Sequence, residues 1–128
     1  MPLFSRKEKK RVLIVEDDAL LAKVLVEKFL SSGFDVLNVM NGLEVLKETE
    51  QYEPAVILLD LILPGLDGFG VLKLLKGNNT TKEIPVVIMS NLGEESDVRS
   101  ARALGAVDYF IKANMSMEKL VNFVKKNY

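Results

Sequence analysis

Five short apolar runs recur along the chain, separated by stretches of helical periodicity. The runs 12–15, 55–59 and 86–89 are rich in Val, Ile and Leu, and the runs 35–39 and 107–111 are weaker. Continuous apolar runs of this length are typical of strands that are covered on both faces, as in a parallel sheet. The pattern therefore predicts five strands that form one parallel sheet.

Between these runs, apolar residues recur every three or four positions, which predicts helices. The first helix is marked by Leu21, Leu25 and Phe29. The other four are marked by Leu43 and Leu46, by Leu72 and Leu75, by Val98, Ala101 and Leu104, and by Leu120, Val121 and Val124. Residues that commonly cap helices stand at the expected ends, namely Gly33 and Gly105 at C-termini and Asn41, Asp67 and Ser116 at N-termini. Strict alternation of strands and helices predicts an α/β domain with helices on both faces of the sheet.

Length and composition are those of one globular domain. The chain has 128 residues, of which 48% are hydrophobic and 27% charged. We expect the domain to span residues 11–128, with five strand–helix units that leave no room for an output domain. Residues 1–10 form a basic arm that carries Arg6, Lys7, Lys9 and Lys10. We expect this arm to be solvated, and a weak contact with an anionic partner is the alternative.

Several classes of function are excluded by residue types that the chain lacks. It has no histidine and no cysteine, so Ser-His-Asp and Cys-His catalysis, zinc sites of His or Cys, and disulfides are impossible. The absence of cysteine fits a reducing cytoplasm. We expect no membrane association, because no apolar run is long enough to span a bilayer and no secretory segment begins the chain. The net charge of −1 predicts no direct contact with nucleic acid.

Polar residues stand where the predicted strands end. They are Glu16, Asp17 and Asp18 after the first strand, Asp60 after the third, Ser90 after the fourth and Lys112 after the fifth. Ligands of open α/β sheets bind beyond the carboxyl ends of the strands. Taken singly, each residue could be a helix cap, a turn residue or a surface charge. Taken together, three neighbouring carboxylates repel one another, so they are stable at one edge only if protonated or if a cation is bound.

The charges at this edge predict a magnesium site that serves phosphoryl transfer. Glu16, Asp17 and Asp60 carry three negative charges and Lys112 one positive charge, so one divalent cation makes the site neutral. Ligation by oxygen alone favours magnesium over zinc. A phosphate donor can then approach Asp60, whose carboxylate can attack phosphorus to give an acyl phosphate. Lys112 and the Ser90 hydroxyl would hold the phosphoryl oxygens.

Four segments, each at the end of a predicted strand, resemble the receiver domain of bacterial response regulators in their sequences and in their order along the chain. They are residues 13–18 (Leu-Ile-Val-Glu-Asp-Asp), 60–68 (Asp-Leu-Ile-Leu-Pro-Gly-Leu-Asp-Gly), 87–90 (Val-Ile-Met-Ser) and 109–112 (Tyr-Phe-Ile-Lys). The resemblance extends from about Arg11 to the C-terminus. It implies a flavodoxin-like (βα)5 fold with a five-stranded parallel sheet in the order 2-1-3-4-5.

The resemblance also implies a role for each residue of the site. Asp60 would be the phosphoacceptor, and Glu16 and Asp17 would bind Mg²⁺ together with Asp60 and the Ile62 carbonyl. Asp18 would be a helix cap or a supporting acid. Lys112 and Ser90 would contact the phosphoryl group, and Ser90 and Tyr109 would form the conformational switch. The partners would be a histidine kinase or histidine phosphotransfer protein and a downstream protein target. Such a domain is a signalling switch and not an enzyme, although it assists its own phosphorylation and dephosphorylation.

Two residues depart from the family pattern. Ala113 follows Lys112 where proline is usual, which predicts a different course for the loop and a shift of Lys112. Asn91 follows Ser90 where a small residue is usual, which predicts crowding of the phosphate entrance. Both favour the alternative of a degenerate receiver that binds proteins without phosphorylation, whereas retention of every charged site residue opposes it.

Two hypotheses that assign the chain to other classes of protein fit the sequence less well. A flavodoxin-like redox protein needs a phosphate loop rich in Ser, Thr and Gly after the first strand, where this chain has three acids. An aspartyl-phosphate hydrolase needs a cap, for which no residues remain. If the chain is a receiver, Ile62 and Leu92 are apolar and would border the path of a hydrolytic water, which predicts slow self-dephosphorylation. The alternative is that Leu92 points into its loop and screens nothing.

Overall fold

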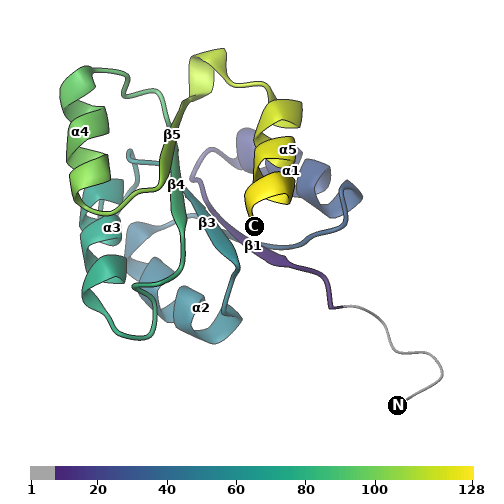
Figure 1. Cartoon of the computed structure of the whole chain (residues 1–128), viewed down its shortest axis with the longest axis horizontal. Coiled ribbons are helices and arrows are strands. Elements are labelled where there is room, and N and C mark those ends of the chain that lie inside the picture. The colour runs from purple at the N-terminus through teal and green to yellow at the C-terminus, as the bar shows by residue number, and fades with distance from the viewer. Residues whose placement is uncertain (1–7) are drawn as a thin grey trace.

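The computed structural model describes residues 8–128, in which strands and helices alternate (Figure 1). The elements are β1 Arg11–Val15, α1 Ala19–Ser31, β2 Asp35–Val39, the 3₁₀ turn η1 Gly42–Glu44, α2 Val45–Tyr52, β3 Val56–Leu59, α3 Gly68–Gly77, β4 Val86–Ser90, α4 Glu95–Ala103, β5 Asp108–Ile111, the 3₁₀ turn η2 Lys112–Asn114 and α5 Met117–Asn127. Each predicted strand is present, with ends that differ by at most one residue. Of the predicted basic arm, residues 1–7 lie outside the described residues, and residues 8–10 are exposed.

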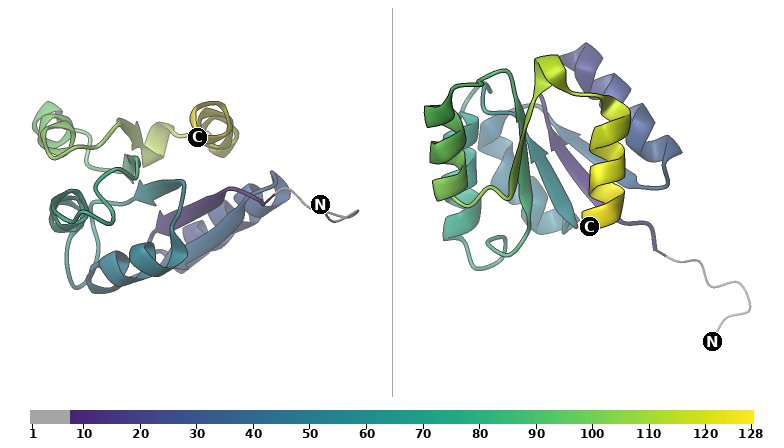
Figure 2. Two further views of the ribbon diagram at one scale, coloured as in Figure 1. Left: turned by 60° about the horizontal axis from the view of Figure 1, so that its bottom comes forward. Right: turned by 45° about the horizontal axis from the view of Figure 1, so that its top comes forward.

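The five strands form one parallel sheet in the order β2-β1-β3-β4-β5, which confirms the predicted fold. Figure 2 (right) shows the sheet between two layers of helices, with α1 and α5 on one face and α2, α3 and α4 on the other. Within residues 8–128, the helices are too short or too polar to span a bilayer.

Alternate residues of each central strand enter two separate apolar cores. In β1, Leu13 packs in the core beneath α2, α3 and α4, whereas Ile14 packs in the core beneath α1 and α5. Both side chains are fully buried. Burial on both faces explains why the strand sequences are continuously apolar, since a polar side chain pointing to either face of the sheet would lose its hydration.

Most of the predicted helix ends are formed as the sequence suggested. The side chains of Asp67 and Ser116 accept hydrogen bonds from backbone amides of α3 and α5, and that of Asn41 accepts one from the first turn of η1. Leu43, which marked the second predicted helix together with Leu46, lies instead in η1, before α2 begins, and is 70% exposed. The segment begins as a 3₁₀ turn, and the change of pitch turns Leu43 away from the core.

A close backbone approach fixes the loop that follows β3. Gly68, the first residue of α3, lies so near this loop that a Cβ atom would stand 2.3 Å from the carbonyl oxygen of Asp60. The amide of Gly68 donates to the carbonyl of Leu61 at 2.9 Å. The start of α3 therefore rests directly on the chain around Asp60 and leaves no space for a side chain at position 68.

Candidate functional site

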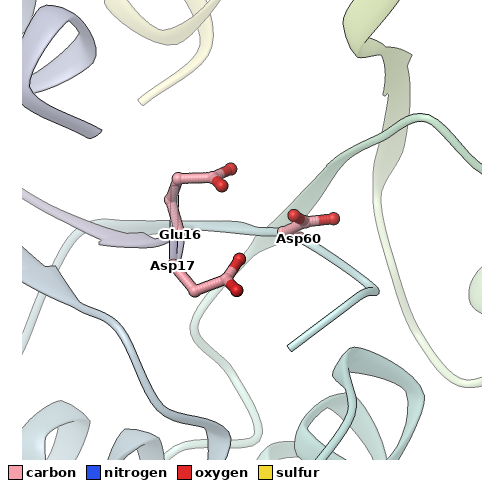
Figure 3. A group of neighbouring side chains, drawn as sticks. All are labelled: Glu16, Asp17 and Asp60. Carbon is pink, nitrogen blue, oxygen red and sulfur yellow. The ribbon is translucent and has the colours of Figure 1, made fainter. Parts of the chain in front are cut away.

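Three carboxylates gather at the carboxyl edge of the sheet. Val15 and Leu59 are paired at the ends of β1 and β3, so the next residues, Glu16 and Asp60, leave the sheet side by side. Oxygens of Glu16, Asp17 and Asp60 all lie within 4.8 Å of one another (Figure 3). Glu16 and Asp60 are buried and Asp17 is exposed. Strand adjacency therefore brings together the acids that the sequence placed at separate strand ends.

Lys112 joins two of these acids from the end of β5. Its Nζ lies 2.5 Å from Oε2 of Glu16 and 2.7 Å from Oδ2 of Asp60. The side chains are 13%, 1% and 5% exposed, respectively, so these are buried ion pairs. The predicted shift of Lys112 from the site was therefore wrong: the turn with Ala113 still delivers the ammonium group to both carboxylates.

Burial and pairing have opposite effects on the two ends of this ion pair. Burial raises the pKa of the Glu16 carboxyl above its ordinary value, an effect that pairing with Lys112 and the hydrogen bond from the amide of Asp18 partly offset. Burial alone would lower the pKa of Lys112, but its pairing with Asp60 and Glu16 outweighs burial and raises it. The ammonium group is thus charged at neutral pH, and its proximity favours the charged form of the buried Glu16 carboxyl.

The donor set suits a hard divalent cation. Glu16 Oε2 is buried and, within residues 8–128, receives no well-aligned hydrogen bond, although it forms the ion pair with Lys112. Three carboxylates and one ammonium leave a net charge of −2. A divalent ion would neutralise this charge and fill the coordination of the buried oxygen.

Backbone contacts hold the acids in place. The amide of Ile62 donates to Oδ1 of Asp60 at 3.2 Å, and the amide of Asp18 donates to Oε1 of Glu16 at 3.0 Å. Asp18 Oδ1 accepts from the amides of Leu20 and Leu21, so this acid caps α1, one of the two roles predicted for it. Asp18 therefore supports the site through its backbone, while its side chain is occupied elsewhere.

Asn38 is a supporting residue that the sequence analysis missed. Its Nδ2 donates to the carbonyls of Ile14 at 3.0 Å and of Glu16 at 3.3 Å, across the boundary between β2 and β1. These bonds tie down the backbone where β1 releases its acids. The signal was the Asn38 amide between the apolar residues Leu37 and Val39, since a partly buried amide needs a hydrogen-bond partner.

Ser90 and Tyr109 meet at the loop after β4. Ser90 is buried, and its Oγ accepts from the amide of Leu92 at 3.2 Å. The Tyr109 hydroxyl donates to the carbonyl of Leu92. Burial, with a further contribution from Asp97, raises the pKa of Tyr109, so its hydroxyl remains a donor. Both predicted switch residues are therefore fastened to the same loop residue.

The structure shows where the two residues after Ser90 direct their side chains. Leu92 is partly buried and packs against the core beneath α2, α3 and α4, which favours the alternative that it screens nothing. The side chain of Asn91 turns toward the chain after β5, where its Oδ1 accepts from the amide of Ala113 at 3.1 Å. By contrast, Ile62 is 55% exposed beside Asp60, as a screening residue would be.

Comparisons with known proteins agree with this geometry. Residues 12–125 match the family described as the response regulator receiver domain. The chain is 34% identical over 104 residues to the probable transcriptional regulator ycf27 of Guillardia theta, an alignment that covers 81% of this chain and 40% of that protein. The chain spans less than half the length of the curated relatives it matches.

Two solved structures resemble the chain in both fold and sequence. The receiver domain of Francisella response regulator 1452 is 30% identical with a TM-score of 0.85, over 92% of this chain and 95% of that one. The Mn²⁺-bound form of response regulator Rcp1 is 30% identical with a TM-score of 0.80, over 92% and 93%. Receiver domains take phosphoryl groups from histidine kinases and bind Mg²⁺ or Mn²⁺ at an acidic pocket. The chain belongs to the response regulator receiver domain family, the signalling domains of two-component systems.

Proposed function

We propose that this receiver is a phosphorylation-activated switch in which Asp60 accepts a phosphoryl group from a phosphohistidine. The donor is a histidine kinase or a histidine phosphotransfer protein, which supplies the histidine that this chain lacks. The observation that carries the proposal is the pairing of the Lys112 ammonium with both Asp60 and Glu16, with the carboxylate of Asp17 alongside. A receiver that has lost phosphoryl transfer has no need to maintain this costly set of buried charges.

In the transfer step, a carboxylate oxygen of Asp60 forms a bond to phosphorus. The bond between phosphorus and the donor imidazole nitrogen breaks, and the imidazole leaves with its electron pair. The Ile62 amide keeps the Asp60 carboxylate oriented through Oδ1. The charged Lys112 and the Ser90 hydroxyl donate to oxygens of the transferred group, where negative charge increases.

Glu16, Asp17 and Asp60 would hold a magnesium ion, with the Ile62 carbonyl as a further ligand. When bound, the ion would offset charge on the phosphoryl oxygens and leave the site close to neutral. The chain's own contribution is a fixed carboxylate cluster, because the ends of β1 and β3 hold Glu16 and Asp60 at adjacent positions.

The output follows from the loop after β4. Attraction of Ser90 toward the phosphoryl group would pull on Leu92, which also holds the Tyr109 hydroxyl. We propose that this movement changes the surface of the last two strand–helix units, especially the face that bears Val98, Arg99 and Arg102, and that a downstream protein binds there. Although the curated relative is named a transcriptional regulator, it is more than twice as long as the matched segment, so no nucleic-acid contact is assigned to this domain.

Intact mass spectrometry after incubation with acetyl phosphate and magnesium tests the acceptor. The wild-type protein should gain one phosphoryl group that hydroxylamine removes, and Asp60→Asn should gain none. Asp67→Asn is the matched control, because Asp67 is an exposed acid of the same loop and asparagine also caps helices. Labelling of the Asp60→Asn protein would refute the assignment. An unlabelled wild-type protein would favour the phosphorylation-independent binding module.

A further inference from the structure

The loop after β4 and the turn after β5 are joined by a side chain where strand pairing ends. Ser90 and Ile111 are the last paired residues of β4 and β5. One step further, Asn91 Oδ1 accepts the Ala113 amide at 3.1 Å. Ala113 lies in η2, and the first amides of a helical turn have no partner within that turn. Asn91 therefore supplies the acceptor that the turn itself lacks.

This contact links the two residues that depart from the family pattern. Proline at position 113 would have no N–H and would fix its own φ angle. Alanine keeps its N–H and lacks the fixed φ angle of proline. Both Asn91 and Ala113 are exposed, so water would otherwise accept from this N–H, and what Asn91 adds is a restraint on the backbone that a small residue at position 91 would not supply.

We infer that Asn91 is a positioning residue that holds the turn after β5 against the loop after β4, and thereby keeps Lys112 on Asp60 and Glu16. Its part in phosphoryl transfer rests on the function proposed above. We call the bond between Asn91 and Ala113 the Asn91 clasp. It acts on Lys112 through the backbone of the next residue, so Asn91 itself touches none of the reacting atoms.

The clasp completes a set of restraints on both sides of Lys112. Before the lysine, the Ile111 backbone is paired with Ser90. The Ile111 side chain lies against Gly93, so close that a Cβ atom added to Gly93 would stand 3.3 Å from Ile111 Cδ1. After the lysine, Ala113 is held by Asn91. A lysine side chain is long and flexible, so the position of its backbone determines how much of the time its ammonium group contacts Asp60. Small misplacements of such a group slow a reaction.

A double-mutant cycle tests the clasp. With magnesium saturating, Asn91→Ala should lower the rate constant for phosphorylation by acetyl phosphate about three- to tenfold, the effect of one lost hydrogen bond. Magnesium affinity should be unchanged, because the acids are untouched. In the Ala113→Pro background, Asn91→Ala should have no further effect, since no N–H remains to be accepted. Asn114→Ala, an exposed asparagine of the same turn, is the matched control.

A second readout separates the clasp from the proposed function. Asn91→Ala should speed hydrogen exchange of the Ala113 amide and increase the mobility of the Lys112 Cε methylene in NMR relaxation, while Asn114→Ala should do neither. These NMR changes would support the clasp even in a protein that acetyl phosphate fails to label, a failure that would count against the proposed function alone. The clasp is overturned if exchange at Ala113 is unaffected by Asn91→Ala. It is also overturned if that variant is phosphorylated at the wild-type rate or faster, as crowding by Asn91 would predict.

Discussion

Removal of the Lys112 charge should destabilise the fold, and the size of the effect should depend on pH. The ammonium of Lys112 lies 2.5 Å from Glu16 and 2.7 Å from Asp60, and all three side chains are largely buried. Lys112→Met keeps the apolar stem and deletes the charge. Breaking a buried pair by removing one partner typically costs about 3–5 kcal/mol, because the other charge is left without compensation.

The Glu16 part of this loss has an upper limit, which the pH and the ordinary pKa of a glutamate set. In the variant, Glu16 can take up a proton and become neutral. At pH 7.5, three units above the ordinary Glu pKa of 4.5, protonation costs at most about 4 kcal/mol, at 1.36 kcal/mol per unit. At pH 5.5 the same limit is about 1.4 kcal/mol. The gap between the wild-type protein and the variant should therefore narrow as the pH falls.

The direction of this dependence follows from proton binding. The folded-state pKa of Glu16 is raised above 4.5, so the folded protein binds more protons than the unfolded chain between 4.5 and that raised value. In this window the free energy of unfolding falls as the pH rises. The pKa of Lys112 is raised above 10.5, so its contribution is complete below 10.5 and is lost only as the pH rises through the raised value. From pH 5 to 8 the pH dependence of the stability difference thus comes from the Glu16 carboxyl and not from the Lys112 ammonium.

Urea unfolding in EDTA at pH 5.5, 6.5 and 7.5 measures the effect. Lys119→Met on α5 is the matched control, because Lys119 is exposed. The double variant Glu16→Gln/Lys112→Met should regain much of the lost stability, since no unpaired charge stays at that position. Equal stability of Lys112→Met and Lys119→Met at pH 7.5 would refute the reasoning. So would a loss that stays constant from pH 5.5 to 7.5.

Two further predictions concern the acids and the lifetime of the phosphorylated state. Asp17→Asn should weaken magnesium binding, measured by calorimetry, more than Asp18→Asn, because Asp17 offers an oxygen to the carboxylate cluster whereas Asp18 caps α1; equal effects would show that the ligand is wrongly assigned. Ile62→Asn should speed loss of the phosphoryl group several-fold by orienting water beside Asp60, while Leu92→Glu should chiefly lower the urea midpoint because Leu92 packs on the core. Unchanged decay in Ile62→Asn would contradict the screening role.

The sheet and the acidic cluster could be predicted from the sequence because both follow from short-range rules. Burial of a strand on both faces makes its sequence continuously apolar, and Leu13 and Ile14 enter different cores while neither is polar. Carboxyl ends of parallel strands share one edge, so Glu16 and Asp60 had to lie at the same side once the strands were known. The order of the strands, in contrast, came from the family resemblance.

Side-chain directions in the loops could not be predicted in this way. Leu92 and Ile62 each stand two residues after a site residue and are both apolar, yet Leu92 packs on the core and Ile62 is exposed. No periodicity governs such positions, because a loop takes its course from the elements that it joins. The acceptor role of Asn38 was missed for a related reason: its partners, the carbonyls of β1, become neighbours only after the sheet forms.

The residues after Ser90 and Lys112 show why departures from a family pattern should be weighed as a pair. Taken one at a time, Asn91 predicted crowding of the entrance and Ala113 predicted a displaced lysine. The structure joins the two through one hydrogen bond while the Lys112 ammonium rests on both acids. The amide donor at position 113, which proline would lack, meets the acceptor at position 91, so in the proposed clasp the two departures act together. Their separate effects on stability and rate should therefore not be additive, which is the signature of a direct contact.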